Sequence, residues 1–211
     1  MPNEGGVMEK EIEERFLSVC RSKINQLELI FKGFRVPSEN VIQEADQMRE
    51  EVKRHSTELA RFIISESTPT RKGRDWAKPY LSMVTSFERM GYNMDGMVDC
   101  LKAMLKNHVL FSDHAVKEVN DIFQGAMDLL ERLPELIQTG NKLLAQRIGE
   151  QVRSILKIAN GYSEDHEERL IQGVCVPKSS PHYLGLLESL RGIIAHILEI
   201  SGKVVLISNR S

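Results

Sequence analysis

The sequence contains little cysteine, and its cysteines are not paired. Three cysteines are spread over 211 residues, and none belongs to a Cys-x-x-Cys motif. An odd number of widely separated thiols provides neither a disulfide framework nor a structural zinc site, and it fits a reducing compartment. We therefore expect a cytoplasmic protein. The three residues are Cys20, Cys100 and Cys175.

A net charge of one sign and long apolar runs are also absent. With 28 basic and 30 acidic residues, the chain has no overall electrostatic attraction to nucleic acid or to an anionic membrane. No segment approaches the roughly 20 uncharged apolar residues of a spanning helix. The first residues, MPNEGGVMEKEIEERF, lack the pattern of a secretory signal. We expect no nucleic-acid partner and no membrane insertion.

Motifs of the common catalytic and metal sites are missing as well. The chain has no glycine-rich phosphate loop, no nucleophile elbow and no His-Glu-x-x-His. A di-iron bundle needs Glu-x-x-His on facing helices, and none of the six histidines has a glutamate three residues before it. We expect a non-catalytic protein. An all-α enzyme whose site has no local motif is the alternative.

The chain is rich in apolar residues spaced three and four apart, while alternating, strand-like stretches are nearly absent. This period is typical of amphipathic helices, so the predicted fold is all-α. The pattern predicts six helices, over about 12–34, 38–63, 75–107, 112–138, 141–172 and 180–206. N-cap signals begin three of them: Ser38, Ser112 or Asp113, and Ser180 followed by Pro181.

Two prolines and one Asn-Gly pair bear on the continuity of these helices. Pro79 lies in or near the first turn of the third helix, where its missing donor matters least. Pro134, in ERLPELIQTGN, is expected to kink the fourth helix or end it early. Asn160–Gly161 could break the fifth helix, but we expect that helix to continue through YSEDHEERLIQG.

The six predicted helices form two groups of three, which indicates an internal duplication. A shift of 102 residues places the third helix on the sixth. The paired residues are Pro79 with Pro181, Val84 with Leu186, Arg89 with Arg191, and Val98 with Ile200. We predict two similar three-helix bundles packed together, the first over residues 8–109 and the second over 110–208.

The matched residues Arg89 and Arg191 are charged groups within apolar stretches. An unpaired buried charge costs several kcal/mol. We hypothesise that each arginine forms a structural ion pair with an acidic residue of a neighbouring helix. The alternative is a surface arginine at the boundary of the apolar face.

Five methionines form a seam on the third predicted helix. They are Met83, Met90, Met94, Met97 and Met104, and their spacings of seven, four, three and seven residues place them on one helix face. Core filling is the ordinary role of such a stripe. An exposed seam would instead form an adaptable surface for a partner helix or a homodimer.

Acidic residues one helical turn apart are candidate metal ligands, because two carboxylates on one face can hold a divalent or ferric ion. The candidates are Asp46 with Glu50, Glu164 with Glu168, and the single residue Glu88. Solvation and salt links such as Glu50 with Arg54 also explain such pairs. His166, between two acidic residues, could be a ligand or a proton switch, but a solvated histidine is the more ordinary interpretation.

Two segments carry a resemblance to a known family. FERMGYN, late in the first predicted repeat, and HEERLIQGVCVPKSSPHYLGLLESLRGI, late in the second, resemble the PhoU family of phosphate-uptake regulators. The resemblance is closest to the cytoplasmic PhoU-like domains of sodium/phosphate cotransporters, and it spans about residues 10–205. It implies two three-helix bundles, a Leu-Glu-Arg-Ile-Gly-Asp type of run in the third helix of each repeat, and surface carboxylates that bind iron or zinc.

The family run is only partly present in this chain. Glu88, Arg89 and Gly91 match it in the first repeat, but Tyr92 stands at its last acidic position. In the second repeat Arg191 matches. There, Leu190 and Ile194 stand at the two acidic positions.

The resemblance therefore implies a non-catalytic regulator that binds a phosphate transporter or a sensor kinase and modulates phosphate transport or signalling. A homodimer is a further partner that it allows. The alternative is a PhoU-like protein that binds iron or zinc through partial ligands, for which the candidates are Asp46, Glu50, Glu88 and His166.

Overall fold

A computed structural model of the chain describes residues 4–209. Within this range every regular element is a helix, which confirms the predicted all-α class. None of these helices has the length and apolar character needed to cross a membrane. The elements are α1 (Glu4–Arg35), α2 (Glu39–Glu66), α3 (Arg71–Lys106), α4 (Asp113–Leu130), α5 (Leu133–Thr139), α6 (Lys142–Ile171) and α7 (Ser180–Ser208).

Local sequence signals explain some of these boundaries. Of the predicted N-caps, Ser38 makes no side-chain capping hydrogen bond, and Ser179 rather than Ser180 occupies the N-cap position of α7. The Ser112 hydroxyl accepts a hydrogen bond from the N–H of Ala115 and caps α4. The predicted fourth helix is divided into α4 and α5 because Pro134 has no N–H to donate to the carbonyl of Leu130. As expected, α6 continues through the Asn160–Gly161 pair.

The third helix begins earlier than predicted, at Arg71 rather than near residue 75. Thr70 caps it, since its hydroxyl accepts a hydrogen bond from the N–H of Gly73. The first turn of the helix, residues 71–74, is polar. Because it has no apolar residues at helical spacing, the sequence pattern did not indicate that it is helical. Pro79 consequently lies in the third turn of the helix rather than the first, and it is buried there.

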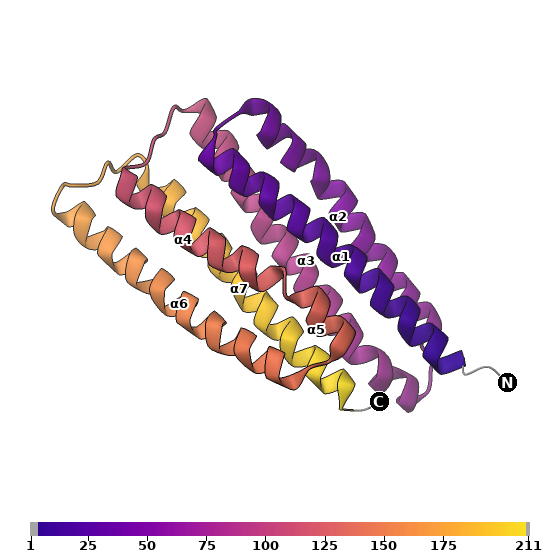
Figure 1. The fold of residues 1–211 in the computed structure, drawn as a ribbon. Coiled ribbons are helices and arrows are strands. Elements are labelled where there is room, and N and C mark those ends of the chain that lie inside the picture. The colour runs from indigo at the N-terminus through magenta and orange to yellow at the C-terminus, as the bar shows by residue number, and fades with distance from the viewer. Residues whose placement is uncertain (1–3, 210–211) are drawn as a thin grey trace.

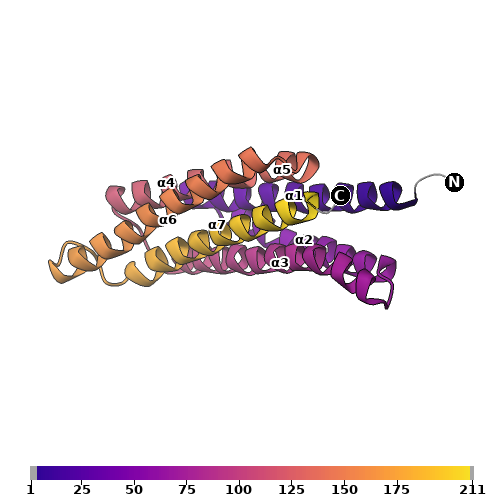
Figure 2. The same cartoon turned by 90° about the horizontal axis from the view of Figure 1, so that it is seen from below.

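The helices form an elongated bundle (Figures 1 and 2). α1, α2 and α3 pack on one another, as do α4, α6 and α7, and α3 lies along α7 where the two groups meet. The connections of residues 36–38, 107–112 and 172–179 lie at one end of the bundle, which we call the loop end (Figure 1). Both described chain ends lie at the other end.

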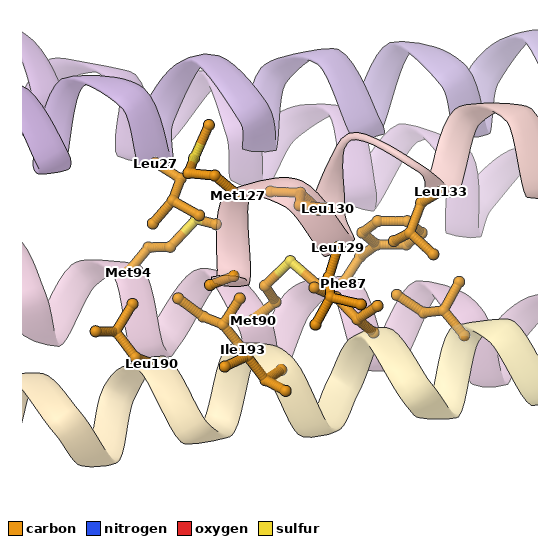
Figure 3. Packing of buried hydrophobic residues seen from close by; sticks show 14 of the residues in the cluster. Leu27, Phe87, Met90, Met94, Met127, Leu129, Leu130, Leu133, Leu190 and Ile193 are labelled. Carbon is orange, nitrogen blue, oxygen red and sulfur yellow. The ribbon is translucent and has the colours of Figure 1, made fainter. Parts of the chain in front are cut away.

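The two groups of helices share one apolar core. Its buried side chains come from all seven helices, and Figure 3 shows residues of α1, α3, α4, α5 and α7 packed together. Met83, Met90, Met94 and Met97 are at most 1% exposed, and the fifth residue, Met104, is partly buried against the same core. The methionine seam therefore fills the core rather than forming a partner surface. The division into repeats at residues 109 and 110 stays a prediction.

Candidate functional site

The four candidate metal ligands do not converge in the structure. The carboxylate of Asp46 on α2 lies 2.6 Å from Lys102 Nζ and 2.8 Å from Arg49 Nε. Glu50 is exposed, Glu88 is half-buried on α3, and His166 lies on α6. Among the described residues no group of three or more His, Cys, Asp or Glu side chains is arranged to hold a metal ion. Iron or zinc binding therefore stays a prediction without a geometric site.

The two matched arginines have different surroundings. Arg191 Nη1 lies 3.1 Å from Glu188 Oε2, so this ion pair lies within α7 and not between helices as hypothesised. Arg89 on α3 is exposed. The pKa of Glu199 on α7 is lowered chiefly by a hydrogen bond with His196, and the charge of Arg89 adds to this effect. Among the described residues neither arginine forms the hypothesised ion pair with a neighbouring helix, and Arg89 contributes only its charge at Glu199.

His166 is 2% exposed, so its interpretation as a solvated side chain is wrong. Its Nε2 lies 2.8 Å from Ser180 Oγ, and its ring packs on Tyr183 with centroids 4.4 Å apart. Burial and the charge of Arg169 lower the pKa of His166. The flanking Asp165 and Glu167 are exposed because successive residues on a helix point in different directions.

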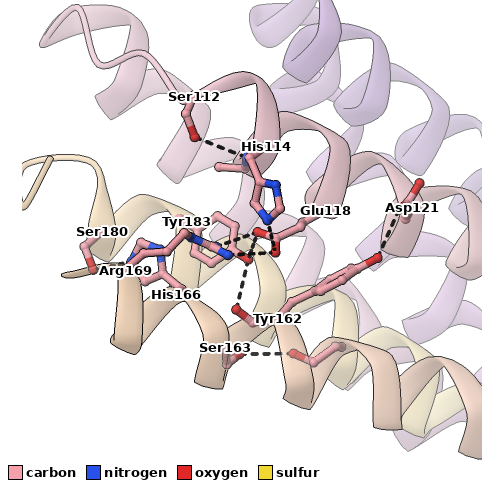
Figure 4. Close-up of polar contacts among 12 residues, drawn as sticks. Ser112, His114, Glu118, Asp121, Tyr162, Ser163, His166, Arg169, Ser180 and Tyr183 are labelled. Atoms are coloured by element: carbon pink, nitrogen blue, oxygen red, sulfur yellow. Dashed lines mark hydrogen bonds and ion pairs between the residues drawn. The ribbon is translucent and has the colours of Figure 1, made fainter. Parts of the chain in front are cut away.

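A buried polar cluster surrounds Glu118 of α4 (Figure 4). Its side chain is 4% exposed and accepts hydrogen bonds from Arg169 Nη1 and Nη2 at 3.2 and 2.8 Å. The Tyr183 hydroxyl donates to the same carboxylate at 2.6 Å, and His114 Nε2 lies 3.0 Å away. These contacts connect α4, α6 and α7, and they hold the last turn of α6 before the loop of residues 172–179.

Sequence reasoning missed this cluster, although one signal was present. Glu118 follows Ala115 by three residues and precedes Ile122 by four, so it lies on the apolar face of its helix. A charge at such a position requires a buried partner. The partner, Arg169, stood in HEERL, but its pairing across 51 residues cannot be read from local spacing.

A small cavity of about 80 Å³ lies among α1, α2 and α3. Lys23 and Gln26 of α1 line it and are 1% and 0% exposed. Desolvation lowers the pKa of Lys23 to about 8, against the opposing charges of Asp95 and Glu88. Glu88 was a candidate from sequence, whereas Lys23 and Gln26 were not, because one polar side chain in a long amphipathic helix is not distinctive.

The loop end exposes apolar side chains that the sequence analysis did not single out. The most exposed, Leu110, has 83% of its surface accessible, and it borders an apolar cavity of about 220 Å³ beneath the loop. Lys178 Nζ donates to the carbonyl of Asn107 at 2.9 Å and ties two of the loops together. The loop-end apolar set comprises Val36, Leu110, Ile171, Val174 and Val176.

Comparisons place this architecture among solved structures. Neither a protein-family model nor a curated protein sequence matches the chain. The crystal structure of the phosphate transport system regulatory protein PhoU from Streptococcus pneumoniae superposes with a TM-score of 0.82 at 14% identity, over 98% of this chain and 97% of that one. A PhoU-like phosphate regulatory protein from Shewanella oneidensis gives a TM-score of 0.50 at 13% identity, over 95% and 100% of the two chains. The chain therefore has the fold of the PhoU proteins over nearly its whole length, as the resemblance predicted.

Proposed function

We propose that this protein is a non-catalytic regulator of phosphate transport or phosphate signalling that acts by binding a partner protein. The observation that carries the proposal is the likeness to a phosphate transport regulatory protein along both complete chains, at a TM-score of 0.82. Because fold alone does not define function, the proposal also needs a surface through which such a protein could act.

The loop end supplies a surface of the required kind. Val174 and Val176 are 69% and 64% exposed, and they lie in the loop held by the Glu118 and Arg169 cluster. Apolar side chains placed on an anchored loop lose little freedom on binding, so they are suited to contact a protein. We assign the partner contact to the loop-end apolar set, with a phosphate transporter or a sensor kinase as the partner.

Binding to the organism's purified phosphate transporter tests this assignment. We expect Val174→Asp and Leu110→Asp each to weaken binding at least about tenfold, because a charge would have to be desolvated in an apolar contact. Leu143→Asp is the matched control: this leucine is 54% exposed but lies in the first turn of α6, far from the loop end. Biolayer interferometry with the wild type and the three variants gives the comparison.

Equal affinity of the wild type and the two loop-end variants would remove the loop end as the contact. Absence of binding by the wild type to both the transporter and the phosphate sensor kinase would contradict the proposed partners. Circular dichroism of each variant shows whether the helices are intact.

A further inference from the structure

The cavity among α1, α2 and α3 has a polar wall that the partner-binding role does not use. The charged and amide side chains of this wall are Lys23, Gln26, Arg49, Lys53, Glu88 and Asp95. Tyr92 is 70% exposed, so the cavity meets solvent beside it. A water molecule needs about 10–15 Å³ of such space, so 80 Å³ admits a small polyatomic solute.

The innermost cation of this cavity is Lys23. Its ammonium lies against α3 where Gly91 leaves room, since a Cβ on Gly91 would be 2.5 Å from Lys23 Nζ. In the described part of the chain no carboxylate lies within ion-pair distance of Lys23, although the charges of Asp95 and Glu88 act on it. A buried ammonium without a direct partner is costly, and an anion at the cavity would satisfy it.

Gln26 is the second unsatisfied group. It is fully buried, and both its Nε2 and its Oε1 lack a hydrogen-bond partner. Burial raises the pKa of the nearby Asp95 carboxyl, and the Gln26 amide opposes this rise only weakly, since neither of its polar atoms meets a partner in hydrogen-bond geometry. Since buried amides are normally bonded, this one has capacity for a ligand as both donor and acceptor.

A second cation of the cavity wall, Lys53, is not engaged in an ion pair within the described residues. Arg49 is already engaged, since its guanidinium contacts Asp46, Asp95 and Asp99. Lys53 is exposed, and within the described residues its ammonium has no ion pair. An anion that enters beside Lys53 would therefore meet a second, deeper ammonium at Lys23.

The wall contains hydrogen-bond acceptors as well as donors, so it favours an anion that can both accept and donate hydrogen bonds. Lys23 and Gln26 Nε2 donate, whereas Asp95, Glu88 and Gln26 Oε1 accept. An oxyanion that keeps a hydroxyl proton can satisfy both kinds of group. Phosphate carries at least one O–H at neutral pH, whereas sulfate carries none, so carboxylates in the wall repel sulfate without a compensating hydrogen bond.

We propose that this cavity binds a protonated oxyanion, with inorganic phosphate as the ligand, held between Lys23 and Gln26 on one side and Asp95 on the other. The choice of phosphate among such anions rests on the proposed function. A site of this kind would let the regulator respond to the solute whose transport it modulates. It lies among α1, α2 and α3, and none of its lining residues belongs to the loop-end apolar set.

Isothermal titration of the full chain with inorganic phosphate, and with sulfate at equal ionic strength, tests the proposal. We expect phosphate to bind and sulfate to bind at least about tenfold more weakly. Lys23→Met and Gln26→Leu are expected to abolish measurable binding. Lys32→Met, which removes an exposed charge from the same helix, is the matched control and should bind as the wild type does. Circular dichroism verifies the fold of each variant.

Absence of phosphate binding by the wild type, equal binding of sulfate, or unchanged binding by Lys23→Met would each overturn the site. The outcome is separable from that of the partner experiment. A chain that binds the transporter but not phosphate retains the proposed function and loses this site. A chain that binds phosphate but neither partner retains the site and loses the proposed partners.

Discussion

Replacement of Arg169 by methionine is expected to lower the free energy of unfolding by about 3–5 kcal/mol. The substitution removes both hydrogen bonds to Glu118, whose side chain is 4% exposed, and leaves this carboxylate buried with much less compensation. Methionine retains most of the apolar volume of the arginine stem, so the loss reports the charge rather than the packing. Urea unfolding followed by circular dichroism measures the difference.

Two further variants make this result interpretable. Arg153→Met removes an exposed arginine from the same helix and should change stability by no more than about 0.5 kcal/mol. The double variant Glu118→Leu/Arg169→Met removes both charges and should recover most of the loss, since an apolar pair often replaces a buried ion pair at little cost. A loss below about 1 kcal/mol for Arg169→Met would show that Glu118 does not depend on this arginine.

The second large effect has the opposite sign. Lys23→Met is expected to stabilise the protein by about 3 kcal/mol at pH 7, because burial lowers the pKa of Lys23 from 10.5 to about 8 and each pKa unit corresponds to about 1.4 kcal/mol. Between these values the unfolded chain binds more protons than the folded one. The free energy of unfolding of the wild type should therefore rise relative to that of the variant from pH 8 to pH 10.5. Above pH 10.5 the two proteins should be about equally stable.

Chemical unfolding of the wild type and Lys23→Met at several values between pH 7 and pH 10.5 provides the measurement, in buffers without phosphate or sulfate. Lys32→Met, at an exposed position of the same helix, should follow the wild type throughout. A variant less stable than the wild type at pH 7, or a gap that does not change with pH, would show that the Lys23 ammonium is well compensated.

A stability cost at Lys23 is the pattern expected at a functional site. Proteins retain unfavourable buried charges chiefly where a ligand or a partner uses them. The Glu118 cluster differs, since its carboxylate is already bonded to Arg169 and Tyr183. The two buried charges therefore have separate roles: Glu118 holds three helices together, and Lys23 remains available to a ligand.

Much of the fold could be predicted from local sequence because helices follow from local signals. The apolar period identified every long helix, and Pro134 identified the break between α4 and α5. The early start of α3 was missed because its first turn is polar and is fixed by the Thr70 cap. The packing of the two groups on each other was predicted, but not which side chains meet there, since contacts between α3 and α7 join segments about 100 residues apart.

The candidate site was predicted less well, for a physical reason. Spacing along a helix shows which residues share a face, but not whether that face is covered by another helix or exposed to solvent. His166 was interpreted as solvated because its neighbours are acidic, yet α7 covers it with Ser180 and Tyr183. Lys23 and Gln26 gave no signal, because a polar residue on α1 becomes informative only when α2 and α3 enclose it.

The resemblance to PhoU proteins predicted the overall fold, which residue spacing alone could not identify. The structure shows where the residues that differ from the family run lie. Leu190 and Ile194, at the two acidic positions of the second repeat, are fully buried in the shared core. Tyr92, at the last acidic position of the first repeat, is exposed beside the Lys23 cavity. These positions serve packing and the cavity mouth in this chain.

Phosphate uptake in the organism of origin tests the regulatory role most directly. The rate of uptake of labelled phosphate would be compared in the parent strain, a strain lacking this gene, and that strain carrying either the wild-type gene or Val174→Asp at equal protein level. The proposed function predicts that deletion changes the rate, that the wild type restores it, and that Val174→Asp does not. The same rate in all four strains, in both phosphate-rich and phosphate-poor medium, would contradict it.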